Sequence, residues 1–181
     1  MSKNKRQKRK SRQNDALADR IPQADQSDRH ILYQRAVQCV ESEIDMVDET
    51  FHKLRGREAV TLREDFCGTA NTSCEWVRRR ENNRAWAVDL DEDVLAWGQK
   101  NNVGALKEPV AERVVLIHDD VLTVDTPPMD MVLAMNFSYW IFHSRDALRG
   151  YFARIRDCLV DDGILFLDFY GGYESMHEMK E

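Results

Sequence analysis

Acidic or amide side chains follow four short apolar segments of this sequence. They belong to Glu64 and Asp65, Asp89, Asp119 and Asp120, and Asn136. If the apolar segments are strands of one parallel sheet, their carboxyl ends meet at the edge where open sheets bind ligands. We therefore expect the four segment ends to share one binding site.

Asp89 has the type and position of a ribose-binding residue. Its carboxylate can accept hydrogen bonds from both the 2′ and 3′ hydroxyl groups of a ribose, and it repels a 2′-phosphate. It follows Gly68 by 21 residues, close to the spacing of about 20 that this role requires. We assign the nearby Asp91 to the start of the next helix, as its N-cap.

The segment from 66 to 70 contains the small residues Gly68, Thr69 and Ala70. Small residues let the backbone approach a ligand, and a following helix offers free N–H groups that can hold a phosphate or a carboxylate. A tight strand-to-helix turn without any ligand explains this composition equally well.

Asp120 stands where a carboxylate can accept from an exocyclic amine such as that of adenine. Its neighbour Asp119 can do the same, and either can instead stabilise a turn. We expect His118 to be packed or hydrogen-bonded rather than catalytic, because no catalytic partner is evident. The aromatic run from 137 to 142 either builds an apolar pocket wall or forms ordinary core beneath a loop.

Short apolar segments alternate with helical periodicity along the chain, and this alternation predicts the elements that position these residues. Strands are expected at 59–62, 85–88, 114–117, 129–135 and 164–169, and helices at 70–80, 91–102 and 145–159. Asp161, Asp162 and Gly163 are expected to form a turn before the fifth strand, and the link from the third strand to the fourth is expected to be a loop. The pattern predicts an α/β fold of three layers, with an open, mostly parallel sheet covered by helices on both faces.

The amino-terminal part divides into a basic tail and a helical segment. Residues 1–12 carry a charge of +7 and no acid, so the rest of the chain carries −13. We expect residues 1–27 to be a disordered tail, and nucleic acid is a partner only through that tail. Residues 28–56 are expected to form one amphipathic helix, or two with a break, beginning at Asp28 and ending at Gly56.

The composition limits the remaining classes. The 181 residues suffice for one ordinary domain, and no apolar run reaches the roughly 18 residues of a membrane span. The basic tail lacks the apolar stretch of a secretory signal, so we expect a cytoplasmic protein without a membrane partner. The four cysteines and five histidines lack the spacing of a metal site, and no metal is expected.

The same segments resemble the motifs of class I S-adenosylmethionine-dependent methyltransferases. LREDFCGTA at 62–70 is similar to the first motif of that family, and AVDLDEDVLAWG at 87–98 to the second. IHDDVL at 117–122 resembles the third motif, MDMVLAMNFSYW at 129–140 the fourth, and the segment 165–170 the fifth strand. The order and spacing of all five, over residues 58–172, make the resemblance specific.

The resemblance implies a Rossmann-like fold with S-adenosylmethionine as its cofactor. Glu64 takes the acidic position of the first motif, with Asp65 as the alternative, and Asn136 faces the transferred methyl group. The segment 28–56 takes the place of a helical lid, in which the ring face of Tyr33 can favour the sulfonium. The implied cofactor site consists of Tyr33, Glu64, Asp65, Phe66, Cys67, Gly68, Thr69, Asp89, Leu90, Asp119, Asp120, Val121 and Asn136.

Two departures from the family pattern concern the first motif and the length. The first motif usually has three glycines, whereas Phe66 and Ala70 replace the outer two here. The family sheet has seven strands, and Glu181 follows the fifth, so we expect residues 57–181 to form an incomplete methyltransferase domain.

The expected function is methyl transfer to an unidentified small-molecule acceptor. Transfer from a sulfonium is an in-line displacement, in which the protein aligns the acceptor and excludes water. No general base or covalent nucleophile is evident, so catalytic residues stay unassigned. Three alternatives are open: a nucleotide-dependent oxidoreductase, although the GxGxxG of that class is absent; a non-catalytic cofactor-binding or scaffold fragment; and a nucleic-acid-modifying enzyme, which only the basic tail favours.

Overall fold

The computed structural model describes residues 26–172, and the chain divides into two units between Gln38 and Cys39. The first unit contains helix α2 (Arg29–Val37), which the Asp28 carboxylate caps by accepting from the N–H groups of His30 and Ile31 at 2.8 and 3.2 Å. The tail expected to be disordered lies outside the described residues up to position 25.

The second unit begins with helix α3 (Val40–Arg55). This helix ends at Gly56, whose left-handed backbone (φ 68°) lets its N–H donate to the carbonyl of His52. Of the two expected alternatives, one helix or two with a break, the structure shows the second, and both expected end residues are confirmed. Since the unit boundary precedes α3, the second half of the expected lid belongs to the sheet unit and packs in its core.

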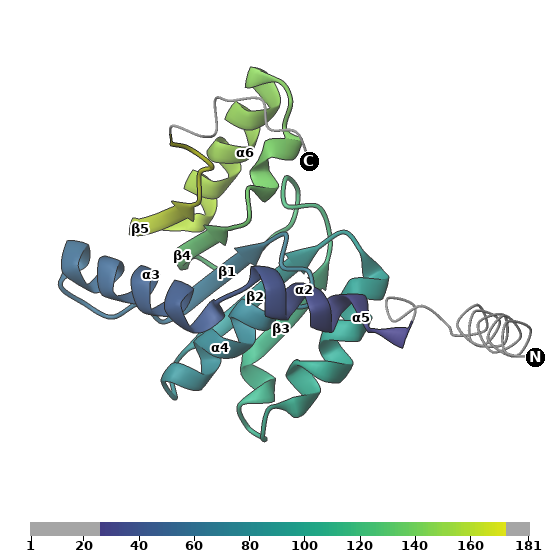
Figure 1. The fold of residues 1–181 in the computed structure, drawn as a ribbon. Helices are drawn as coiled ribbons and strands as arrows, with labels where there is room; N and C mark the ends of the chain where they lie inside the picture. Colours follow the sequence, from purple (N-terminus) through teal and green to yellow (C-terminus); the bar gives the residue numbers. More distant parts are fainter. Residues whose placement is uncertain (1–25, 173–181) are drawn as a thin grey trace, which may run out of the picture. The chain divides into compact units, whose positions relative to one another are not determined.

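Five parallel strands form the sheet in the order β3-β2-β1-β4-β5 (Figure 1). The strands are β1 (Thr61–Asp65), β2 (Arg84–Asp89), β3 (Val114–His118), β4 (Met129–Ala134) and β5 (Leu159–Leu167). The helices between them are α4 (Asn71–Arg79), α5 (Glu92–Asn101) and α6 (Arg145–Cys158), with short 3-10 segments at Val103–Ala105, Ala111–Arg113 and Ser138–Ile141. The expected open parallel sheet is confirmed, and its strand order reverses between β1 and β4, which is where such sheets bind ligands.

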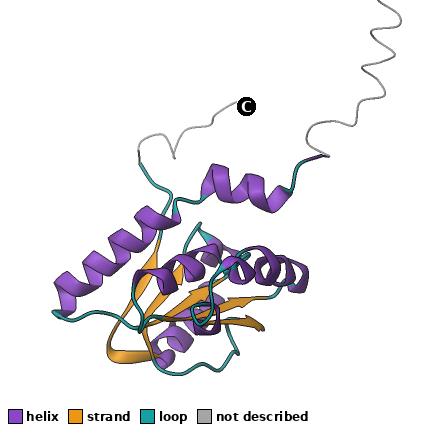
Figure 2. Cartoon of the chain, turned by 90° about the horizontal axis from the view of Figure 1, so that it is seen from below, coloured by secondary structure: helices purple, strands orange, loops and turns teal. Residues whose placement is uncertain are grey.

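Helices cover both faces of the sheet (Figure 2). On one face, α3 and α4 bury Ile44, Phe51 and Trp76 against Leu62 and Met131 of the strands. On the other face, α6 buries its own apolar side against residues of β2, β4 and the loop after β3, in a cluster that contains Tyr151, Ile155, Val88, Val132 and Val121. Apolar burial on both faces explains why β2, β3 and β4 are mostly apolar rather than alternating. The exception is β1, which carries three charged residues at Arg63, Glu64 and Asp65.

The expected turn at residues 161–163 is wrong, because these residues lie within β5. Met129 pairs with Leu159 and Met131 with Ile164, so the intervening residues form an irregularity in the strand. Asp162 is held there by Arg57, which donates to both of its carboxylate oxygens at 2.7 and 2.8 Å. Gly163 fits because a Cβ at this position would lie 3.0 Å from the Met129 carbonyl oxygen. These tertiary contacts, rather than local turn chemistry, decide the conformation.

The two acids at the end of β1 point to opposite faces of the sheet. The buried Asp65 carboxylate pairs with the buried Arg63 guanidinium at 2.6 Å and accepts from the Tyr151 hydroxyl at 2.8 Å. Arg63 also donates to the Val121 carbonyl at 2.9 Å. Burial raises the pKa of Asp65, and the Arg63 charge opposes that rise. This network joins β1, α6 and the loop after β3 beneath the carboxyl edge of the sheet.

Glu64, on the other face, is bound to the start of α4. Its Oε2 accepts from the Ser73 backbone N–H at 2.9 Å and from the Ser73 hydroxyl at 2.5 Å. Burial raises the pKa of Glu64 to about 7, although the hydrogen bonds from Ser73 lower it. The residue therefore titrates near neutral pH.

Within the described part of the chain, no helix is long and apolar enough to cross a membrane.

We predict that Arg63→Met lowers the free energy of unfolding by about 3–5 kcal/mol, because it leaves the Asp65 carboxylate buried without its partner charge. The double variant Arg63→Met/Asp65→Asn should lose less, since no unpaired charge remains and the amide can still accept from Tyr151. Urea unfolding of both variants measures the difference. A double variant that is as unstable as the single one would contradict this account.

The raised pKa of Glu64 predicts a pH dependence of stability. Between its ordinary pKa of 4.5 and the raised pKa of about 7, Glu64 is protonated in the folded state and ionised in the unfolded state. The free energy of unfolding therefore falls as pH rises through this window. The total effect is up to about 3 kcal/mol. Urea unfolding of the native chain and Glu64→Gln at pH 5, 6, 7 and 8 tests this, because only the native chain should show this contribution. Equal slopes would refute it.

Candidate functional site

The loop after β1 has a left-handed backbone at every second residue. The φ angles are 57° at Phe66, 52° at Gly68 and 55° at Ala70. A left-handed backbone costs an L-residue with a Cβ about 1–2 kcal/mol. The loop therefore has three positions whose backbone favours glycine, although only Gly68 is a glycine.

The Phe66 and Ala70 side chains are used in packing. The Phe66 ring lies 6.1 Å from the rings of both Phe142 and Tyr151. Ala70 is fully buried in a small cluster with Cys67 and Ala87. These contacts offset the unfavourable backbone at both positions. Cys67 itself is buried, and burial raises the pKa of its thiol well above the usual value, so it is not a reactive thiolate.

Asp89 ties this loop to the end of β2. Its Oδ2 accepts from the Gly68 N–H at 2.7 Å, and its Oδ1 accepts from the Asp91 N–H at 2.9 Å. Each carboxylate oxygen has a second lone pair, so both can still accept from a ligand hydroxyl. The side chain is partly exposed. Asp91 caps α5 by accepting from the Val94 N–H at 3.1 Å, which confirms its expected role.

Helix α5 approaches the loop without a side chain between them. A Cβ on Gly98 would lie 2.6 Å from the Thr69 carbonyl oxygen. Asn102, directly after α5, donates through its side-chain amide to the same oxygen at 2.8 Å. Only a glycine allows this approach, so Gly98 fixes the position of Thr69. The residue lies inside the second motif, but its role depends on a neighbour 29 residues earlier and could not be assigned from spacing alone.

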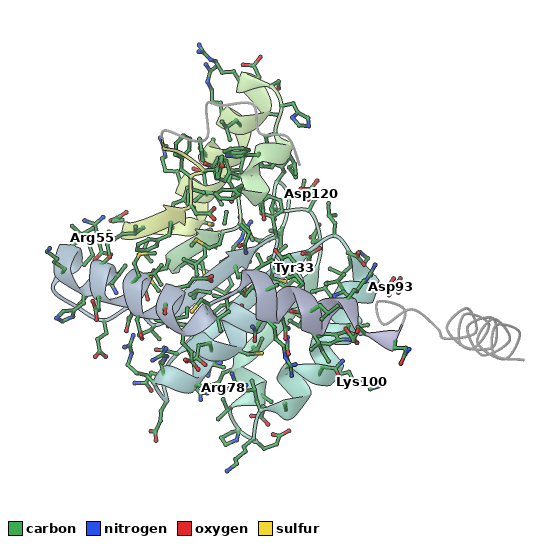
Figure 3. The ribbon with its side chains drawn as sticks, viewed as in Figure 1. Tyr33, Arg55, Arg78, Asp93, Lys100 and Asp120 are labelled. Carbon is green, nitrogen blue, oxygen red and sulfur yellow. The ribbon has the colours of Figure 1, made fainter. Side chains whose placement is uncertain are left out.

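The turn after β3 uses both of its acids. Asp119 accepts from the Asp120 N–H at 2.7 Å and from the Thr123 hydroxyl at 3.3 Å. Asp120 accepts from the Leu122 N–H through Oδ1 at 2.9 Å. Both acids thus stabilise the turn, one of the two alternatives expected from the sequence. Asp120 lies near the carboxyl ends of the strands, whereas Arg55, at the end of α3, lies toward their amino ends (Figure 3).

The ring of His118 is hydrogen-bonded, as expected. Its Nε2 lies 3.0 Å from the carbonyl oxygen of Leu90, which joins the ends of β2 and β3. The Leu90 side chain is 62% exposed, so it presents an apolar surface beside Asp89. Val121 is buried, and its carbonyl accepts from Arg63. An adenine-side role for these residues stays a prediction.

The loop after β4 is held by an acid that the sequence analysis missed. Asn136 and Phe137 both have left-handed backbones, with φ of 58° and 57°. Their N–H groups donate to the two carboxylate oxygens of Asp168, each at 2.8 Å. The Tyr139 hydroxyl donates to the Asp168 carbonyl at 3.1 Å. Asp168 directly follows β5, which ends at Leu167. The sequence analysis placed the end of this strand at residue 169 and therefore did not recognise Asp168 as an acid at a strand end.

A second missed acid, Glu43, comes from the first turn of α3. Its Oε1 accepts weakly from the Cys39 N–H at 3.4 Å, and its Oε2 is buried without a partner among the described residues. Burial raises the pKa of Glu43, and the nearby negative charge of Asp168 raises it further. Glu43 also raises the pKa of Glu64 through its charge. Glu43 therefore lies close enough to Asp168 and to Glu64 to interact electrostatically with both.

The structure brings most of the expected site residues to one edge. The loops after β1, β2, β3 and β4 meet there and contribute Phe66 to Thr69, Asp89, Leu90, Asp119, Asp120 and Asn136. Asp65 lies beneath this edge, because Arg63 and Tyr151 hold its carboxylate in the core. Tyr33 lies on α2 in the separate first unit, and its role in a lid stays a prediction.

Comparison with known proteins finds similarity to solved structures and not to family models or curated sequences. No protein-family model matches the sequence, and no curated protein matches it. An S-adenosylmethionine-bound amino pentose methyltransferase from Micromonospora echinaspora superposes with a TM-score of 0.64 at 18% identity, over 78% of this chain and 56% of that chain. A sugar N-methyltransferase from Streptoalloteichus gives a TM-score of 0.67 at 16% identity, over 85% of this chain and 58% of that one.

A third solved structure extends the likeness. An S-adenosylmethionine-dependent methyltransferase from Clostridium acetobutylicum gives a TM-score of 0.62 at 20% identity, over 76% of this chain and 54% of that one. The chain thus spans little more than half the length of these neighbours. Together with the strand order, these likenesses show that the chain has the Rossmann-like fold of class I S-adenosylmethionine-dependent methyltransferases.

Proposed function

We propose that this chain binds S-adenosylmethionine at the carboxyl edge of its sheet and takes part in methyl transfer to a small-molecule acceptor. The observation that carries the proposal is the position of Glu64. Dinucleotide-binding sheets place a pyrophosphate at the amino end of the helix after the first strand. Here the Glu64 carboxylate already accepts from the Ser73 N–H in the first turn of α4. Glu64 thus occupies an N–H group that a phosphate would need, and its ionised form, populated above a pH of about 7, also repels a phosphate. Both effects disfavour NAD and similar ligands.

The charge of the edge suits a cationic ligand. Glu43 interacts electrostatically with Asp168 and with Glu64, and Asp89 adds a further carboxylate at the end of β2. S-adenosylmethionine carries a positive sulfonium and an ammonium group, whereas a dinucleotide carries negative phosphates. The acidic surroundings thus favour the first ligand over the second.

The adenosine part has matching polar groups. Both oxygens of Asp89 can accept from the ribose hydroxyl groups. Asp120 uses Oδ1 within its turn, and its Oδ2 has no partner among the described residues, so it can accept from the adenine amine. In the left-handed loop at residues 66–70, the half-buried Gly68 has no side chain, so the methionine part can approach its backbone. Each assignment follows the motif position of the residue and fits its observed contacts.

The reaction requires little covalent chemistry from the protein. The cofactor supplies an activated methyl group when bound, and the chain has to orient the acceptor and exclude water. Asn136 lies after β4 in a conformation that Asp168 fixes, which suits a residue beside the transferred group. Two of the solved neighbours named above are described as an amino pentose methyltransferase and a sugar N-methyltransferase, and this supports a small-molecule acceptor.

We predict that Asp89→Ala weakens S-adenosylmethionine binding about 10- to 100-fold, because two hydrogen bonds to one charged group are lost. Asp91→Ala is the matched control, an acid two residues away that caps α5, and should change affinity less than threefold. Calorimetric titration with S-adenosylmethionine and with NAD measures both. Tighter binding of NAD, or an equal effect of the two variants, would refute the assignment.

We also predict that Gly98→Ala weakens S-adenosylmethionine binding at least tenfold and lowers the melting temperature, because the new Cβ displaces the Thr69 backbone. Gly150→Ala is the control, since Gly150 lies in α6 and a Cβ there meets nothing within 4 Å. That variant should keep the affinity and gain about 0.5–1 kcal/mol of stability. Normal affinity in a folded Gly98→Ala variant would contradict the role of the close approach.

A further inference from the structure

Four aromatic rings form an exposed cluster beside the loop after β4. Phe137 lies 5.4 Å from Trp140 and 6.0 Å from Tyr170, and Trp140 lies 6.4 Å from Phe169, measured between ring centroids. Their exposed fractions run from 36% at Phe137 to 76% at Phe169. We call Phe137, Trp140, Phe169 and Tyr170 the aromatic cluster. It draws on two separate segments, one after β4 and one after β5, which meet only at this edge of the sheet.

The aromatic cluster is built around Asp168. The carboxylate accepts from the Phe137 N–H at 2.8 Å, and Phe169 is its direct neighbour in the chain. Each of its oxygens holds one backbone N–H and retains a lone pair. Within residues 26–172, no lysine or arginine pairs with this carboxylate. Aromatic faces and an uncompensated negative charge thus occur together, which is the combination that attracts an organic cation.

Glu43 supplies a second, independent observation. Its Oε2 is buried and lacks a hydrogen-bond donor among the described residues, and a buried acceptor without a partner is costly. The charge of Asp168 is close enough to raise the pKa of Glu43. A ligand that carries N–H groups and a positive charge would satisfy this oxygen. An apolar partner would cover the rings but would leave the oxygen unsatisfied.

We propose that the aromatic cluster, with Asp168 and Glu43, binds the methyl acceptor and that this acceptor is a basic amine. The inference rests on the proposed function and names the substrate class of the same site. The rings contact the amine and its apolar surroundings, and the two carboxylates favour its cationic form. The amine nitrogen then lies beside Asn136, next to the position proposed for the methyl group.

The chemistry balances without a further reactant. The bound ammonium gives one proton to the Glu43 carboxylate and becomes a neutral amine. Its lone pair attacks the methyl carbon, a C–N bond forms, and the electrons of the C–S bond go to sulfur. The products are a methylated ammonium and the neutral thioether S-adenosylhomocysteine. Glu43 suits the proton transfer because burial already raises its pKa.

The test uses two small probes of equal shape and different charge, choline and 3,3-dimethylbutan-1-ol. We expect the full chain to bind choline about fivefold more tightly than the neutral alcohol, measured by ligand-observed NMR titration, because only the cation gains from the rings and acids. Trp140→Leu should abolish this preference. Glu43→Gln should weaken choline binding while leaving the alcohol unchanged, because it removes a carboxylate charge; choline has no N–H group, so the variant tests the charge of Glu43 and not its hydrogen bond. Phe152→Leu, which replaces an exposed aromatic residue of α6 outside the cluster, is the matched control.

Equal affinity for the two probes, or a preference that survives in Trp140→Leu, would overturn the proposal. It would also be overturned if sedimentation showed a dimer that Trp140→Leu dissociates, because the cluster would then be an interface between copies. S-adenosylmethionine titration of the same samples separates the two claims. If S-adenosylmethionine binds and no preference for choline appears, the amine inference fails alone. If S-adenosylmethionine does not bind, the proposed function fails.

Discussion

The Asp89 carboxylate joins the loop after β1 to the start of α5. It accepts from the N–H groups of Gly68 and Asp91 at the same time, and so fixes the distance between the loop after β1 and the loop after β2. The close approach of Gly98 to Thr69 fixes the same loop from the helix side. A ligand that reaches the lone pairs left on Asp89 therefore meets a loop whose backbone is already in place. Such preorganisation reduces the ordering cost of binding.

The first loop adopts left-handed backbone conformations at two residues that are not glycine. Phe66 and Ala70 keep left-handed angles because both are fixed by packing, Phe66 against two rings and Ala70 in a buried cluster. The same solution recurs after β4, where two left-handed residues are held by the carboxylate of Asp168. In both loops the surrounding structure offsets the local cost. Both loops also border the candidate site.

Much of the fold could be predicted from the sequence because strands and helices alternate with clear periodicity. The positions of Asp89, Asp120 and Asn136 followed from the strand ends alone. The remainder depends on contacts between distant residues. The sequence alone predicts Asp65 as a site residue. In the structure, Arg63 and Tyr151, the latter 86 residues away, hold its carboxylate in the core. The turn expected at Asp161 to Gly163 failed because Arg57, about 100 residues earlier, holds Asp162 in the strand.

The central claim is that S-adenosylmethionine binds along the ends of β1, β2 and β4. The most direct measurement is a two-dimensional ¹⁵N–¹H NMR titration of the chain with this ligand. The account predicts saturable shifts of the amide signals of Gly68, Asp91 and Asn136, with little change at Gly56 and Asp162 on the opposite edge of the sheet. Shifts confined to other regions, or a spectrum of a folded chain that does not change, would contradict it.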